Sequence, residues 1–208
     1  MNFRRVLTIL LILVPMLAVS AQDQSLINRF YAGVSESCLD ISYSYSARIS
    51  GILNSGNGHL CAQGLMWSMK GNGVEMYCDA KSLWIVDRST KEVVIEPAAD
   101  ENASEWLSNP ALIFSQLQGH FKVSESLSVS GGQSVIYVLK PLDDSGISYC
   151  NLELQKSDAS IRNATVALSD GTLIKIEVSS MKLTPKVSVE AFRPHIDFDS
   201  SWILTDLR

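Results

Sequence analysis

The side chains best suited to chemistry in this chain of 208 residues are four cysteines and three histidines. His59, His120 and His195 lie far apart, and the cysteines include no C-x-x-C pair, so the spacings do not predict a metal site. An even number of cysteines in an exported chain instead favours two disulfide bonds, and the sequence leaves their pairing open. The candidates are Cys38, Cys61, Cys78 and Cys150.

Known catalytic motifs are also missing from the sequence. It has no G-x-S-x-G elbow, no H-E-x-x-H motif and no glycine-rich loop for phosphate. Asp143 and Asp144 are adjacent in a turn, where both carboxylates are expected to face water rather than to form an acid–base pair. We therefore expect a protein that is not an enzyme and needs no cofactor, with a secreted enzyme as the least favoured alternative.

The N-terminus has the features of a secretory signal peptide over residues 1–21. Two arginines precede an apolar run over residues 6–17, which is too short to span a bilayer, and small residues follow it. Cleavage after Ala21 would leave residues 22–208, a length that suits a single domain. No cysteine follows the cleavage site immediately, so we expect a soluble exported protein, with an uncleaved membrane anchor as the alternative.

The expected mature chain is acidic. Removal of Arg4 and Arg5 from the 17 basic residues leaves 15 against 22 acidic ones, so the net charge becomes about −7. Binding to nucleic acid depends on clustered lysine and arginine, which this sequence lacks. Nucleic acid is therefore not an expected partner.

Strand patterns dominate the rest of the chain. Apolar and polar residues alternate over residues 40–49, which predicts a strand with one wet face. Glycine, asparagine and aspartate separate further short strands, and residues 70–73 and 169–171 have the signatures of hairpin turns. These strands are expected at residues 58–69, 74–78, 83–87, 92–96, 121–129, 134–139, 147–155, 161–168, 172–181 and 186–192.

Two amphipathic helices accompany these strands. Apolar residues recur at helical spacing over residues 26–34, and Asn109 with Pro110 can begin an apolar helix that Gly119 would end. About eleven short strands with only two helices favour a curved antiparallel sheet, because a parallel sheet needs a helix at every crossover. We expect an open half-barrel with both helices over its open side. Periodicity does not decide whether the enclosed space is a packed core or a ligand cavity.

The arrangement of short motifs resembles the LolA family of periplasmic lipoprotein carriers. A strand with Tyr43 and Tyr45 follows the N-terminal helix, and Gly56 and Gly58 open the strand that contains Trp67. Residues 79–84 resemble the family's S-D-G-x-x-L-W turn and strand, and residues 109–113 resemble its proline-led helix. Residues 192–198 and 205–208 resemble its last strand and its terminus.

This resemblance implies a periplasmic, monomeric carrier with an incomplete antiparallel barrel capped by helices. An apolar cavity would shield the acyl chains of a lipoprotein on its way from a release complex in the inner membrane to an acceptor in the outer membrane. The implied cavity residues are Tyr43, Tyr45, Leu65, Trp67, Met69, Val74, Met76, Leu112 and Phe114. The lid helices would contribute Leu26, Ile27, Phe30, Ile113 and Leu117.

One departure from the family pattern leaves other functions open. Many members carry an Arg-Pro pair shortly before the position of Trp67, and its arginine binds the lid, whereas residues 63–66 here are Gln-Gly-Leu-Met. The alternative is a lipid-binding sensor or an accessory module of an envelope or lipid-linked biosynthetic pathway.

Overall fold

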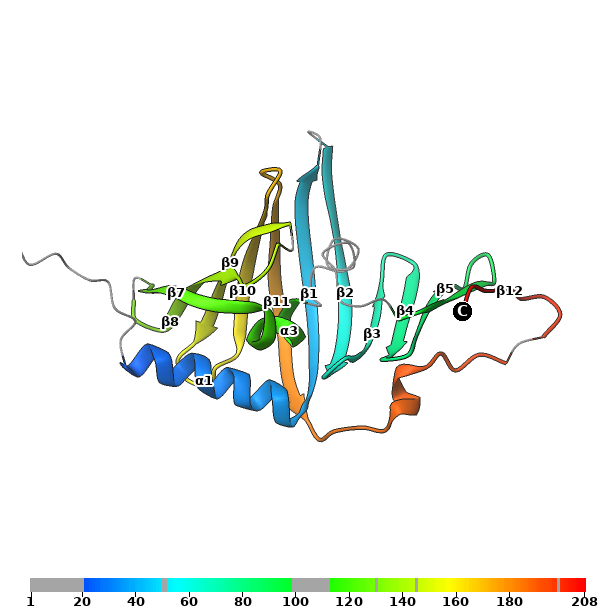
Figure 1. Ribbon diagram of the computed structural model, residues 1–208, viewed down its shortest axis with the longest axis horizontal. Helices are drawn as coiled ribbons and strands as arrows, with labels where there is room; N and C mark the ends of the chain where they lie inside the picture. Colours follow the sequence, from blue (N-terminus) through cyan, green and yellow to red (C-terminus); the bar gives the residue numbers. More distant parts are fainter. Residues whose placement is uncertain (1–20, 50–51, 99–112, 130, 145, 198) are drawn as a thin grey trace, which may run out of the picture.

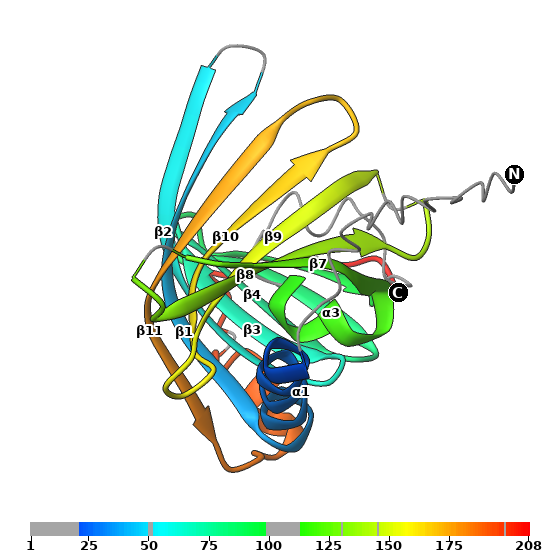
Figure 2. The same cartoon turned by 90° about the vertical axis from the view of Figure 1, so that its left-hand side faces the viewer.

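Short strands with alternating polarity pair here into one open, curved sheet with two helices against its concave face (Figures 1 and 2). The computed structural model describes residues 21–49, 52–98, 113–129, 131–144, 146–197 and 199–208. The helices are α1 (Ala21–Glu36) and α3 (Ile113–His120). The strands are β1 (Cys38–Ile49), β2 (Ile52–Gln63), β3 (Met66–Gly71), β4 (Val74–Asp79), β5 (Ser82–Asp87), β6 (Glu92–Pro97), β7 (Phe121–Ser128), β8 (Ser134–Pro141), β9 (Ile147–Gln155), β10 (Ile161–Leu168), β11 (Leu173–Thr184) and β12 (Ile203–Asp206).

Strands from the N-terminal and C-terminal parts of the chain pair with each other in the middle of the sheet, where the strands are longest. Its strand order is β12-β6-β5-β4-β3-β2-β1-β11-β10-β9-β8-β7, so β1 lies between its hairpin partner β2 and the distant β11. This confirms the predicted half-barrel, with twelve strands among the described residues instead of about eleven.

Tight turns set the register of the hairpins. Asn72 (φ 52°) and Gly73 (φ 81°) occupy the left-handed region and connect β3 to β4, with Gly71 paired to Val74. That conformation suits the hairpin turn predicted over residues 70–73, of which Asn72 and Gly73 form the loop. With this register Cys78 pairs with Trp67.

One predicted strand is two strands. The sequence predicts a single strand over residues 58–69, but β2 ends at Gln63 and β3 begins at Met66. Gly64 makes the connecting turn with φ at 59°, a conformation that glycine adopts without steric cost. Apolar residues stand close on both sides of this turn and hide it in the sequence.

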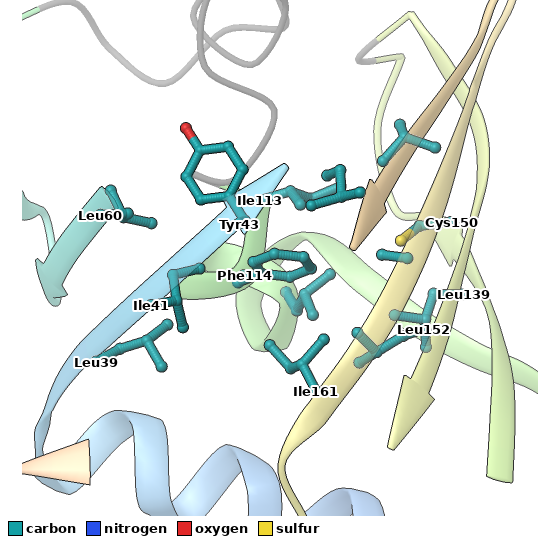
Figure 3. Packing of buried hydrophobic residues seen from close by; sticks show 14 of the residues in the cluster. Leu39, Ile41, Tyr43, Leu60, Ile113, Phe114, Leu139, Cys150, Leu152 and Ile161 are labelled. Atoms are coloured by element: carbon teal, nitrogen blue, oxygen red, sulfur yellow. The ribbon is translucent and has the colours of Figure 1, made fainter. Parts of the chain in front are cut away.

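Both helices cover the same face of the sheet. Leu26, Ile27 and Phe30 of α1 and Ile113, Phe114 and Leu117 of α3 are buried in one cluster with residues from β1–β5 and β7–β11. In Figure 3, Phe114 lies among Ile41, Ile113 and Ile161. We call this side of the sheet the inner face.

No helix in the described part of the chain is long and apolar enough to cross a bilayer.

The opposite, outer face is covered on one half by the chain that follows β11 (Figure 1). This C-terminal segment (residues 185–202) contains the short 3₁₀ helix η2 (Val189–Phe192) and leads to β12, which pairs in parallel with β6. Ile196 and Trp202 pack on a second cluster formed by Tyr77, Val86, Val93 and Ile95.

Two expectations for the C-terminus are therefore wrong. Residues 186–192 form no strand, nor do the described residues 193–197 of the expected last strand, and the last strand is β12 at Ile203–Asp206. Phe192 is fully buried. Its apolar side chain packs the turn at η2 against the outer face of the sheet and does not belong to a strand. The parallel β12–β6 pair also departs from the purely antiparallel sheet that was expected.

Candidate functional site

An apolar cleft opens between the C-terminal half of α1, helix α3 and the turns that join β2 to β3 and β4 to β5. Its volume is about 490 Å³, within the range of small-ligand sites. Tyr31 and Val34 of α1 face Phe114 and Leu117 of α3 across it. We call it the α1–α3 cleft.

The β2–β3 turn supplies the rim of the α1–α3 cleft. Gln63, Gly64, Leu65 and Met66 all line it. The left-handed Gly64 lets the chain reverse in so few residues that Leu65 is left 58% exposed at the opening. A large apolar side chain held in water beside an apolar cleft is suited to meet an apolar ligand.

The Gln63 side chain holds this rim to the C-terminal segment. Its Nε2 donates to the carbonyl oxygen of Val187 at 3.2 Å, and its Oε1 accepts from the Val187 N–H at 2.9 Å. The neighbouring Lys186 lines the cleft and brings a positive charge to its edge. The opening of the cleft is thus apolar with a basic margin.

A buried hydroxyl lies beside the cleft. The Oη atom of Tyr31 is inaccessible and has no hydrogen-bond partner in the described structure. Burial, with a smaller contribution from nearby Cys150, raises the pKa of Tyr31 to about 12, so the phenol stays neutral. A buried hydroxyl without a hydrogen bond lowers the stability of the fold. Tyr31 differs in this respect from the other tyrosines of the core.

The two tyrosines that the resemblance implies lie away from the cleft, on β1. Tyr43 is buried against Gly58 of β2, and Tyr45 accepts a hydrogen bond from Asn72 Nδ2 at 2.7 Å. Burial first, and then Tyr45, raise the pKa of Tyr43 to about 12. Neither tyrosine lines the α1–α3 cleft.

The other predicted cavity residues divide into three groups. Leu65 and Phe114 line the cleft, whereas Trp67 and Met69 are buried in the core of the inner face. Val74 and Met76 are half-buried on β4, and Leu112 lies outside the described residues. Among the predicted lid residues, Leu117 lines the cleft, and the core buries Leu26, Ile27, Phe30 and Ile113.

Several lining residues were missed by sequence reasoning. Tyr31 and Val34 belong to the predicted apolar stripe of the first helix, so that stripe was the available signal. Gly64 was the signal for the rim turn, but it stood inside an apparently continuous strand. Nothing local marks the remaining ones, which are Ser35, Gln63, Ala80, Gln118 and Lys186.

A second hollow of about 550 Å³ lies on β10 and β11. Its lining includes Asp158, Arg162, Asn163, Lys175 and Glu177, so charged and amide groups surround it. Such a surface is hydrated and gives no shelter to an apolar ligand. The smaller α1–α3 cleft is therefore the better candidate site.

The sequence matches the family model described as outer membrane lipoprotein carrier protein LolA over residues 66–195, which is more than half of the chain. The chain belongs to the LolA family. No functionally curated protein is significantly similar to it in sequence.

Solved structures of low identity resemble this LolA-family protein. An uncharacterized conserved protein from Thermus thermophilus has 12% identity and a TM-score of 0.53, with 88% of this chain and 98% of that one covered. A LolA superfamily protein from Nitrosomonas europaea has 12% identity and a TM-score of 0.46, with 85% and 99% covered. A putative outer membrane lipoprotein-sorting protein domain from Vibrio parahaemolyticus has 10% identity and a TM-score of 0.44, with 81% and 94% covered.

The two disulfides expected from the sequence stay a prediction. All four are described, and the described residues contain no disulfide bond. Cys38 and Cys61 nevertheless face each other with their Sγ atoms 2.7 Å apart. Cys61 lies opposite Asp40 on the outer face, whereas Cys78 pairs with Trp67 on the inner face, so a bond between Cys61 and Cys78 is excluded by the direction of the side chains.

Two of the three histidines of this LolA-family protein, His59 and His120, sit beside carboxylates on the surface. His59 Nε2 lies 3.1 Å from Asp40 Oδ1, and His120 Nδ1 lies 3.6 Å from Asp143 Oδ2. Each is one His with one acid, and the described residues contain no group of three or more His, Cys, Asp and Glu that could hold a metal ion.

Proposed function

We propose that this LolA-family protein carries lipoproteins through the periplasm and shelters an acyl chain in the α1–α3 cleft. The observation that supports this most directly is the cleft itself, with Leu65 exposed at its opening and Phe114 and Leu117 in its wall. Each CH₂ group that leaves water contributes about 0.8 kcal/mol, so a hydrocarbon chain binds there without any covalent chemistry.

The cellular setting of the proposal follows from the N-terminus and the family. Residues 1–21 would direct export, and the mature residues 22–208 would act as one domain and as a monomer. Cargo would come from a release complex in the inner membrane and pass to an acceptor in the outer membrane. Lys186 brings a basic charge only to the edge of the cleft, and the mature chain is acidic overall. We therefore attribute the binding energy to the apolar walls of the cleft.

The test uses Leu65 because its exposure allows a charge without loss of the fold. Leu65→Glu is expected to weaken binding of a synthetic lipopeptide with palmitoyl chains by about tenfold, since burying one leucine side chain contributes about 1.5–3 kcal/mol. Leu142→Glu is the matched control, because Leu142 is 59% exposed and does not line the cleft. Native mass spectrometry and displacement of a fluorescent fatty acid measure the affinity.

Three outcomes decide the proposal. Loss of binding in Leu65→Glu alone supports an acyl site at the cleft. Equal affinity of both variants places the lipid elsewhere, and absence of binding by the unchanged protein rejects the carrier function.

A lipid-binding sensor or accessory module is the second candidate function. The observation that favours it is the rim turn, where Gln63 binds Val187 of the C-terminal segment in place of the arginine that binds the lid in many family members. A rim turn that is held in place is expected to slow the release of a bound lipid, which suits a sensor that retains its lipid. Transfer of bound lipopeptide to acceptor vesicles distinguishes the two, because a carrier releases its cargo and a sensor keeps it.

A further inference from the structure

Two cysteines meet at the point where β1 begins and β2 ends. Cys38 is the first residue of β1, and Cys61 lies near the end of β2, opposite Asp40. The two cysteines are therefore diagonal neighbours on the outer face of one antiparallel pair. Their Sγ atoms are 2.7 Å apart, a separation that needs only a small movement to reach the S–S bond of about 2.05 Å.

The backbone around this pair is held on both sides. Cys38 is fully buried and pairs with Thr184 of β11, whose Oγ1 donates to the Cys38 carbonyl oxygen at 3.3 Å. On the other side, the Gln63 side chain binds both backbone groups of Val187. The backbone segments that carry the two sulfur atoms thus stay next to each other as long as β1 and β2 remain paired.

The remaining cysteines have no comparable geometry toward each other or toward this pair. Cys78 lies on β4 with its Sγ 3.7 Å from the Leu65 carbonyl oxygen, and Cys150 lies on β9, fully buried. Five strands separate β4 from β9 in the sheet. Both side chains belong to the core of the inner face, whereas Cys38 and Cys61 meet on the outer face.

We propose that the exported protein contains one disulfide bond, between Cys38 and Cys61, and that Cys78 and Cys150 take no part in it. The oxidant is a disulfide, either a protein thiol oxidase or oxidised glutathione. One cysteine thiolate attacks the oxidant and releases its first thiol, and the second cysteine then displaces the other. The S–S bond forms as two cysteines lose two protons and two electrons, and the oxidant's S–S bond is reduced to two thiols.

The surroundings indicate a structural cross-link rather than a reactive one. Burial, the contact with Cys38 and the charge of Asp40 raise the pKa of Cys61 to about 12, and Asp40 itself faces His59. A thiol with a high pKa is a poor leaving group, so attack of an external thiolate at Cys38 would displace Cys61 slowly and the bond would resist reduction. The bond would hold the end of β2 next to the Gln63–Met66 turn that forms the rim of the α1–α3 cleft.

The proposal rests on the proposed function only for the oxidising compartment, and thiol mapping tests it directly. The full protein is exported, purified without reductant, denatured and alkylated. Two of the four cysteines are expected to react, and all four after reduction. Trypsin cuts after Arg48, between the two cysteines, so mass spectrometry should find peptide 30–48 linked to peptide 49–70 until reductant separates them.

Variants distinguish this cross-link from any other pairing. Cys38→Ser is expected to raise the number of reactive thiols from two to three, whereas Cys78→Ser and Cys150→Ser should each keep the linked peptide. Reductant should lower the unfolding temperature of the unchanged protein but not that of the Cys38→Ser/Cys61→Ser double variant.

Two results would overturn the proposal. One is four reactive thiols in the unchanged protein after incubation with excess oxidised glutathione, and the other is a linked peptide that contains Cys78 or Cys150. Lipopeptide binding is measured separately, so loss of that binding with an intact Cys38–Cys61 link would reject the carrier function and leave the disulfide standing.

Discussion

The Arg193 guanidinium binds the Asp79 carboxylate through Nε at 2.8 Å and Nη2 at 2.7 Å and so joins the C-terminal segment to the end of β4. Only 3% of the Asp79 side chain is exposed, and its other oxygen accepts from the N–H groups of Lys81 and Ser82. Arg193 follows the fully buried Phe192, so the ion pair and the apolar contact fix the same turn on the outer face.

Loss of this arginine should destabilise the protein. Arg193→Ala leaves a buried carboxylate with two backbone donors, and we expect the free energy of unfolding to fall by about 1–3 kcal/mol. Urea denaturation followed by circular dichroism measures the change. Arg162→Ala, at an exposed position on β10, is the control and should stay within about 0.5 kcal/mol, so equal effects would contradict the assigned role.

The same site should make stability depend on pH. Burial by itself raises the pKa of Asp79, but hydrogen bonds from the Ser82 N–H, Arg193 and the Lys81 N–H together hold that pKa below its usual value. A depressed pKa contributes stability above the unfolded value of about 3.9, and this contribution is lost as the pH falls through the lower folded value. Asp79→Asn should therefore flatten the acid side of a plot of urea midpoint against pH between about 2 and 6. If the acid-side slope of Asp79→Asn equals that of the unchanged protein, carboxylates other than Asp79 control the loss of stability in acid.

Gly58 of β2 should not tolerate a side chain. A Cβ atom there would lie 2.8 Å from Tyr43 Oη and 2.9 Å from its Cζ, so the buried ring would have to move. We expect Gly58→Ala to lower the free energy of unfolding by about 1–3 kcal/mol, the usual cost of overpacking. Gly119→Ala in α3 meets open space and should be neutral or stabilising by up to about 1 kcal/mol. Thermal unfolding compares the two, and a similar loss in both would argue against the contact with Tyr43.

Two buried tyrosines should respond in opposite ways to loss of the hydroxyl. Tyr137 Oη donates to the Asp23 carbonyl oxygen at 2.6 Å and ties the start of α1 to β8, so Tyr137→Phe should cost about 1 kcal/mol. Tyr31 Oη is buried and has no hydrogen-bond partner among the described residues, so Tyr31→Phe should be neutral or stabilising. Urea midpoints give the energies, and hydrogen exchange should show faster opening of the first turn of α1 in Tyr137→Phe only. A loss of stability in Tyr31→Phe would mean that its hydroxyl has a partner in solution.

The sequence by itself determined the local elements of this protein. Alternation over residues 40–49 is enough for β1, and Asn72-Gly73 and Asp170-Gly171 are enough for two hairpins, because strand polarity and left-handed turns depend on neighbouring residues. The stripe from Leu26 to Val34 is likewise sufficient for α1. The short motifs that resemble the LolA family added the prediction of that family and of its half-barrel fold.

Only the tertiary structure decided which distant residues meet. The α1–α3 cleft combines Tyr31, Leu65 and Phe114 from three separate segments, and Cys38 reaches Cys61 only because β1 and β2 pair in one register. Residues 186–192 have strand composition, yet they pair with no strand and end in η2, whereas β12 pairs with β6. Such choices depend on which edges and faces the rest of the fold leaves uncovered, and no local pattern carries that information.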